Sequence, residues 1–214
     1  MRNAFSLATG VIATCLYLSI VGVLADAPAA NALPHRVLFW ASQNRATLLA
    51  SAPVWTLSVA FLFAFYLSVG ADLVDRCSTR TERTLVHLGV VGGFLTFIIS
   101  LIGFLFLTAL AWLAPAVSPD IAVTLNVLSL LAINLSGIPT ALTLLPWTWV
   151  MHRNKLASEL VVFLGIVVSA LHLVSAWAFQ THGLMSPSGI GVYLGPPLFY
   201  VWVVAVGWLR LRKA

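Results

Sequence analysis

Long runs of apolar residues alternate with short polar segments along this chain of 214 residues. A run of roughly 18 or more apolar residues with almost no charge is typical of a membrane-spanning helix. The pattern therefore predicts an all-α, polytopic transmembrane helix bundle that forms a single domain. About six spans are predicted, at approximately residues 4–24, 53–71, 85–113, 120–151, 159–180 and 192–210.

The first apolar run has two interpretations. It follows Arg2, and residues 25–27 (Ala-Asp-Ala) fit the small-x-small pattern of a signal-peptide cleavage site. The run is also long enough to cross a bilayer, and Pro28 is a poor residue to follow a cleavage site. We expect an uncleaved helix. Cleavage is the alternative, and it would leave five spans.

The longest connection is an outer loop at residues 25–51. Within it, Val37, Trp40, Ala41 and Leu48 can share one helical face, which indicates a short helix in the membrane interface. An irregular loop that caps the bundle is the alternative. The second span is expected to begin at Pro53, because proline is favoured in the first turn of a helix.

Other helix boundaries follow from local signals. Thr79 and Glu82 form the pattern of a capping box and predict the start of the third span. Ser118 precedes Pro119 and predicts an N-cap for the fourth span. Gly137 and Pro139 lie inside that span, so we expect a kink there.

Composition supports the membrane assignment. Hydrophobic residues make up 61% of the chain and charged residues 8%, whereas a soluble domain has roughly 25% charged residues. The net charge of +5 is that of some nucleic-acid-binding proteins. Here, however, the basic residues lie in short loops and form no recognition motif. We therefore expect membrane lipid, and no nucleic acid, as a partner.

The distribution of Lys and Arg predicts the orientation. With six spans, one side of the membrane carries Arg2, Arg76, Arg80, Arg83, Arg153, Lys155, Arg210, Arg212 and Lys213. The other side carries only Arg36 and Arg45. The positive-inside rule then places both termini in the cytoplasm, and we assign the chain to a bacterial inner membrane.

Interfacial aromatic residues give a second indication of six spans, because Trp and Tyr favour the membrane–water interfaces. The residues expected at outer ends of spans are Trp55, Trp112, Trp177 and Tyr193. Those expected at inner ends are Tyr66, Trp147, Trp149 and Trp208.

Polar residues inside a bilayer are costly, so they indicate where function resides. No Lys, Arg, Asp or Glu lies near the middle of a predicted span, which argues against a carboxylate proton relay. His172 lies 13 positions after Glu159, which is ~20 Å into the membrane. The candidate ligand-binding residues are His172, Asn134, Asn126 and Ser136, with Thr140 beside them. The alternative role of these residues is interhelical hydrogen bonding.

No cofactor, metal or catalytic residue is expected. A haem needs two histidines at matched depth, and His87 is much shallower than His172. Cys15 and Cys77 lie at different depths, so we expect no disulfide between them. The spacing of these cysteines also does not fit a metal site.

Two further motifs bear on function. Residues 134–137 (Asn-Leu-Ser-Gly) faintly resemble the Gly-x-Ser-Gly motif of rhomboid intramembrane proteases. Asn134 replaces the first glycine of that motif, and Ser136 would lie ~22 Å below the outer surface. We therefore expect this segment to serve helix packing. The spacing Gly89-x-x-x-Gly93 lets helix backbones approach, within one chain or with a second copy or another membrane protein.

The layout of the whole chain resembles that of small six-helix bacterial membrane proteins of unknown function. The features that carry this resemblance are Gln43-Asn44-Arg45, Gly137 with Pro139, His152-Arg153-Asn154-Lys155 and Arg210-Leu211-Arg212-Lys213. Many of these proteins have a proline in the short fourth loop, and this chain does not. The resemblance implies no activity.

The sequence therefore predicts an integral membrane protein that is not an enzyme and acts as a sensor, an accessory subunit or an interaction partner. A small transporter or channel for a neutral or lipophilic solute, using the region of His172 and Asn134, is the alternative. An intramembrane enzyme is the third hypothesis.

Overall fold

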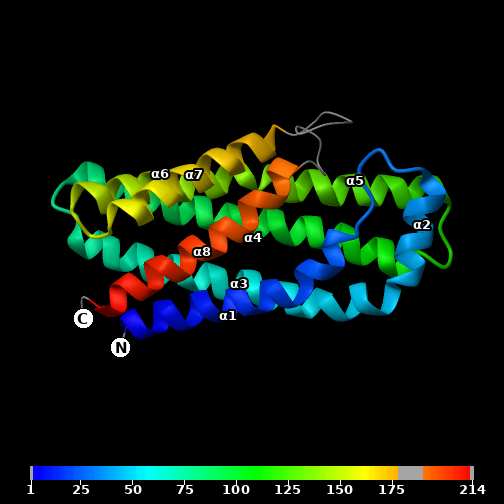
Figure 1. The fold of residues 1–214 in the computed structure, drawn as a ribbon, viewed down its shortest axis with the longest axis horizontal. Helices are drawn as coiled ribbons and strands as arrows, with labels where there is room; N and C mark the ends of the chain where they lie inside the picture. Colours follow the sequence, from blue (N-terminus) through cyan, green and yellow to red (C-terminus); the bar gives the residue numbers. More distant parts are fainter. Residues whose placement is uncertain (1, 178–189, 213–214) are drawn as a thin grey trace.

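The computed structural model describes residues 2–177 and 190–212, and its regular structure there is entirely helical (Figure 1). The predicted all-α class is confirmed. Residues 178–180, the predicted end of the fifth span, lie outside the described residues. The described elements are α1 (Arg2–Ala25), α2 (Pro34–Gln43), α3 (Arg45–Arg76), α4 (Arg80–Leu113), α5 (Pro119–Leu135), α6 (Gly137–Arg153), α7 (Glu159–Ala176) and α8 (Ile190–Arg212).

Five helical stretches in the described part of the chain are long and apolar enough to cross a membrane. They are Ala4–Gly22, Arg45–Arg76, Arg80–Leu113, Pro119–Arg153 and Glu159–Ala176. Helix α8 occupies the position of the predicted sixth span, but its apolar part, Leu194–Leu209, is shorter. The fold is thus a helical bundle compatible with a membrane protein.

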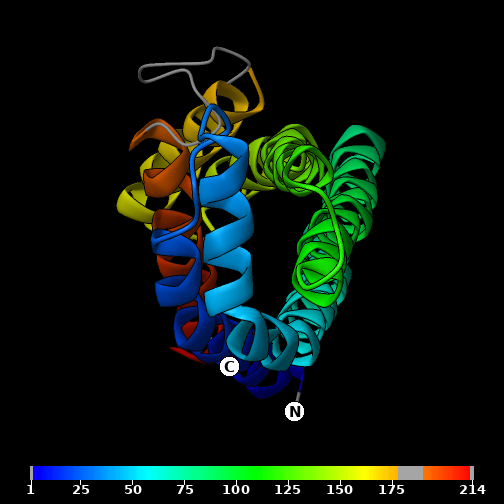
Figure 2. The ribbon, with the colours of Figure 1, turned by 90° about the vertical axis from the view of Figure 1, so that its right-hand side faces the viewer.

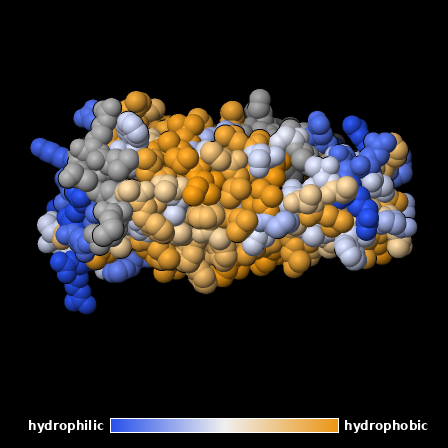
Figure 3. All heavy atoms as spheres, turned by 90° about the horizontal axis from the view of Figure 1, so that it is seen from below, coloured by the Kyte–Doolittle hydropathy of each residue, from blue (hydrophilic) through white to orange (hydrophobic). Residues whose placement is uncertain are grey.

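The long helices run along one axis of the molecule, and both termini lie at the same end (Figure 1). Helix α1 packs against α3 and α8, and the contacts then continue from α3 through α4, α6 and α7 back to α8, which closes a ring. Helix α2 lies across the opposite end of the bundle (Figure 2). The space-filling view shows a hydrophobic middle between two more hydrophilic ends (Figure 3).

The predicted outer segment contains a helix. Val37, Trp40 and Ala41 of α2 are buried, as one face of an amphipathic helix should be, and α2 packs mainly against α5. Leu48 is also buried, but it belongs to α3. That α2 lies in a membrane interface remains a prediction.

The expected helix start at Pro53 is wrong, because α3 begins at Arg45 and Pro53 lies inside it. Its N-cap residue is Asn44, which also ends α2 and donates a side-chain hydrogen bond of 3.0 Å to the Trp40 carbonyl. The turn between the two helices is therefore set at Asn44. A proline within a helix removes one backbone hydrogen bond but does not always end the helix.

Two predicted helix starts are confirmed. The Thr79 side chain accepts a hydrogen bond from the backbone N–H of Glu82, and Glu82 completes the capping box of α4. The Ser118 side chain accepts from the backbone N–H of Ile121 at the start of α5. These contacts satisfy backbone N–H groups that have no partner within their own helix.

The kink expected in the fourth span is a break between α5 and α6 at Ser136. Pro139 has no N–H to donate to the carbonyl of Leu135, which weakens the helix at this point. The Ser136 hydroxyl donates to the Ile133 carbonyl at 2.6 Å. This break places a turn of backbone and a hydroxyl group in the middle of the bundle.

The aromatic pattern agrees only partly with the interfacial positions expected from the sequence. Trp112, Trp149, Trp177 and Trp208 are exposed, as residues facing lipid headgroups should be. In contrast, Trp55, Tyr66 and Trp147 are buried inside the bundle.

Trp147 is buried because of a glycine on a neighbouring helix. A Cβ atom at Gly89 of α4 would overlap the Trp147 indole, so only glycine leaves room for this ring. The indole N–H donates to the Val86 carbonyl at 3.0 Å. Gly89 of the Gly89-x-x-x-Gly93 motif thus serves packing between α4 and α6 of the same chain.

Candidate functional site

A cavity of about 210 Å³ lies inside the bundle and is lined by all the helices except α2. The four residues predicted to form a ligand site, His172, Asn134, Asn126 and Ser136, all line it. The break between α5 and α6 brings Ser136 to the wall, and His172 faces it from α7. That these residues bind a ligand remains a prediction.

Hydroxyl groups form much of the polar wall near His172. Thr140 donates to the Ser136 carbonyl at 2.8 Å, and Ser175 donates to the His172 carbonyl at 2.9 Å. Thr96 donates to the Gly92 carbonyl at 3.0 Å and lies 3.2 Å from the Thr140 hydroxyl. These bonds satisfy the hydroxyl protons within the protein and leave oxygen lone pairs in the wall.

The His172 ring is buried between α7 and α8. Its Nδ1 lies 2.8 Å from the Val168 carbonyl, and its ring packs edge-on against Phe199 with 5.7 Å between ring centroids. A Cβ atom added to Gly195 would be 3.4 Å from the His172 ring. The carbonyl can only accept a hydrogen bond, so Nδ1 carries the proton and Nε2 of the neutral ring is an acceptor.

Asn126 connects the cavity to the segment between α1 and α2. Its side-chain N–H donates to the Pro28 carbonyl at 3.2 Å, and both residues are buried. Ala27, next to Pro28, lines the cavity. The segment of residues 26–33 therefore contributes Ala27 to the cavity wall, and the Asn126 side chain hydrogen-bonds to this segment at Pro28.

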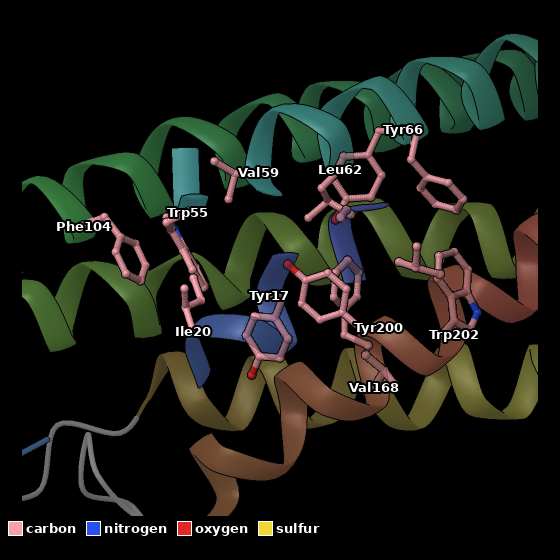
Figure 4. Close-up of a cluster of buried hydrophobic side chains, with 14 of the residues drawn as sticks. Tyr17, Ile20, Trp55, Val59, Leu62, Tyr66, Phe104, Val168, Tyr200 and Trp202 are labelled. Atoms are coloured by element: carbon pink, nitrogen blue, oxygen red, sulfur yellow. The ribbon is translucent and has the colours of Figure 1, made fainter. Parts of the chain in front are cut away.

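Aromatic rings form the apolar wall of the cavity (Figure 4). Tyr17 stacks on Tyr200 with 4.3 Å between ring centroids, and Trp55 stacks on Phe104 at 3.7 Å. The sequence analysis missed these residues. The only available signal was a tyrosine in the interior of an apolar run at position 17, since a hydroxyl there is costly unless it faces a polar interior.

Large side chains close the cavity toward the end with the two termini. The largest of them, each at most 1% exposed, are Trp147, Trp202, Tyr66, Phe65 and Leu144. In this conformation the cavity is thus separated from the end of the bundle where both termini lie.

Among the described residues that line the cavity there is no Asp, Glu, Lys or Arg. Within the described ranges, no group of three His, Cys, Asp or Glu side chains is placed to hold a metal ion. Burying a charged ligand here would leave the charge without a partner, at a high cost in free energy. The cavity is therefore chemically suited to a neutral molecule.

The resemblance to a serine protease motif has no geometric counterpart in the described residues. The Ser136 hydroxyl donates to the Ile133 carbonyl, and the His172 Nδ1 bonds to Val168. A nucleophilic serine needs a hydrogen bond to its base, and none joins these two side chains.

A second polar cluster lies at the end with the two termini, outside the apolar part of α4. Glu82 is buried, and its carboxylate accepts hydrogen bonds from the Ser78 and Thr79 backbone N–H groups at 2.8 and 3.3 Å. Arg153, the last residue of α6, pairs with it at 3.2 Å. Burial raises the pKa of Glu82, but hydrogen bonds from Ser78, Thr79 and Asn154 outweigh burial and hold that pKa below its usual value.

The structure also describes the predicted pair Asp72 and Arg76 and the two cysteines. Asp72 and Arg76 form an ion pair of 3.0 Å on consecutive turns of α3, as their spacing indicated. Cys15 and Cys77 are both free thiols.

Comparisons of the chain with protein family models, with curated proteins and with solved structures gave no match.

Proposed function

We propose that this chain is an integral membrane protein without enzymatic activity that binds a neutral small molecule in its internal cavity. The observation that carries the proposal is the position of His172, Asn134, Asn126 and Ser136 on the wall of one uncharged cavity. At about 210 Å³, the cavity is larger than the ~150 Å³ engineered cavity that binds benzene.

The membrane assignment supports this proposal. We infer six crossings of a bacterial inner membrane, with α5 and α6 together as the fourth and α8 as the sixth. The termini lie at the same end of the bundle as the loops at residues 77–79 and 154–158 (Figure 1). Most of the basic residues of the chain lie at this end, in or next to these loops and the termini. An even number of crossings has this property, and the positive-inside rule makes this end cytoplasmic.

Arginine–tryptophan pairs at both ends of the bundle fit the same orientation. The Arg45 guanidinium lies 5.8 Å from the centre of the Trp112 ring, and that of Arg153 lies 5.3 Å from the Trp149 ring. Tryptophan and arginine are both favoured at the level of lipid headgroups. The two pairs would mark the outer and inner interfaces.

Mass spectrometry of the purified protein tests the proposal. We expect a neutral small molecule to co-purify with the wild-type chain. Ser100 lines the cavity from α4, and Ser100→Phe should displace the molecule by filling the space. Leu105→Phe adds a ring on the same helix at a side chain that is 65% exposed, so this variant should retain it. Equal retention by both variants would contradict binding in the cavity.

Transport of the bound solute is the second candidate function. Transport is favoured by the nature of the barrier between the cavity and the proposed cytoplasmic end. This barrier consists of buried side chains, of which Trp147 and Trp202 are the largest. Uptake into liposomes that contain the protein, compared with empty liposomes, distinguishes a transporter from a sensor or accessory subunit that only binds the solute.

A further inference from the structure

The cavity wall around His172 is rich in hydrogen-bond acceptors. The hydroxyl protons of Ser136, Thr140 and Ser175 are all donated to backbone carbonyls, at 2.6, 2.8 and 2.9 Å. Since a hydroxyl has one proton and two lone pairs, each group presents only lone pairs to a ligand. A ligand that donates a hydrogen bond is favoured at such a wall.

His172 adds the strongest acceptor. Its Nδ1 proton is donated to the Val168 carbonyl, so Nε2 of the neutral imidazole has a free lone pair. No described residue hydrogen-bonds to Nε2, and the ring lines the cavity. A donor on a ligand would form a hydrogen bond with this lone pair at the cavity wall.

The rest of the cavity selects the body of the ligand. Tyr17, Trp55, Phe104 and Tyr200 provide an aromatic wall, and no lining residue that the structure describes is charged. An apolar molecule, in particular one with a ring, would be favoured there, since aromatic rings gain from stacking as well as from burial.

We propose, on the basis of the proposed function, that the cavity takes a neutral, mainly apolar molecule with a hydroxyl group, which donates a hydrogen bond to Nε2 of His172. The class is that of hydrophobic alcohols and phenols. The apolar body packs among the aromatic rings, and the hydroxyl lies against α6 and α7.

The experiment uses 4-ethylphenol and its methyl ether, 4-ethylanisole, in which a methyl group replaces the hydroxyl proton so that the probe can no longer donate a hydrogen bond. Binding to the full-length protein in lipid nanodiscs is measured, with partition into empty nanodiscs subtracted. We expect the phenol to bind about fivefold more tightly than the ether, which corresponds to one net hydrogen bond.

Substitutions assign the preference to His172. His172→Phe replaces the imidazole by another aromatic ring and removes the acceptor, so both probes should bind with equal affinity. His172→Gln keeps an acceptor oxygen and should retain part of the preference. Ser169→Ala removes a buried hydroxyl of α7 that bonds to Gly165 and does not line the cavity, so its preference should equal that of wild type.

The outcomes separate the two proposals. Equal binding of both probes by wild type, or tighter binding of the ether, overturns the donor claim but leaves a cavity that binds neutral solutes. An unchanged preference in folded His172→Phe also overturns it. If neither probe binds wild type above empty nanodiscs, the proposed function fails as well.

Discussion

Gly137, the first residue of α6, lies directly against the backbone carbonyl of His172 on α7, so that a Cβ atom at position 137 would overlap this oxygen. The Ser175 hydroxyl would be 3.0 Å from the same Cβ. The glycine thus allows the break at Ser136 to approach α7, and this approach forms the polar side of the cavity.

Gly137→Ala should therefore destabilise the protein and alter the cavity. Rigid backbone has to move to admit the methyl group, which typically costs about 1–3 kcal/mol. Thermal unfolding in detergent measures the change. Gly22→Ala is the matched control, because a Cβ atom at position 22 of α1 would meet nothing within 4 Å. A neutral Gly137→Ala would contradict the close contact.

Trp147 and Trp149 are two residues apart on α6, and their substitution should have very different effects. Trp147 is fully buried, whereas Trp149 is 42% exposed. Trp147→Ala should lower the free energy of unfolding by about 3–5 kcal/mol, and Trp149→Ala by less than about 1 kcal/mol. Chemical denaturation in micelles compares the two. Similar losses would show that Trp147 is not a core residue.

The helical fold and the polar residues of the cavity wall could be predicted from the sequence, because both follow from the cost of polar groups in hydrocarbon. His172 and Asn126 stand out within apolar runs for that reason. The burial of Trp147 could not be predicted, because it depends on Gly89, which is far away in sequence. The start of α3 was missed because Asn44, and not Pro53, sets that boundary.

Loss of the Glu82 carboxylate should loosen the end of the bundle that holds the termini. Glu82→Ala removes the acceptor for the Ser78 and Thr79 backbone groups and the partner of Arg153. We expect a melting temperature several degrees lower, and a smaller decrease for Glu82→Gln, which keeps an acceptor oxygen. Glu159→Gln, at an exposed first-turn glutamate of α7, should have little effect. Equal effects at positions 82 and 159 would contradict this role.

The same carboxylate predicts a dependence of stability on pH. Because hydrogen bonds hold the pKa of Glu82 below its usual value in the folded protein, its contribution is present above the unfolded-state pKa. The contribution is lost as pH falls through the folded-state pKa. Melting temperatures of wild type and Glu82→Gln should therefore converge at acidic pH. A difference that persists unchanged at the lowest pH would contradict this linkage.

Release of the segment at residues 26–33 should follow loss of the Asn126 side chain. Asn126→Ala leaves the Pro28 carbonyl without its hydrogen bond, and the loss of about 1 kcal/mol corresponds to roughly fivefold faster opening. Hydrogen–deuterium exchange of this segment measures it. Thr124→Ala is the control, since Thr124 is exposed on α5 and bonds only within its own helix. Unchanged exchange in Asn126→Ala would show that the segment is held by other contacts.

Membrane topology tests the central claim most directly, because a cavity inside a bilayer requires that the bundle cross it with the orientation proposed. In a chain without Cys15 and Cys77, single cysteines at Arg36→Cys and Arg80→Cys are labelled with a maleimide that cannot cross membranes. Both positions are exposed in the structure. We expect position 36 to react from outside intact cells, and position 80 and a tag after the C-terminus to react only after lysis. Labelling of both positions from the same side, or the reverse pattern, would contradict the six-span bundle with cytoplasmic ends.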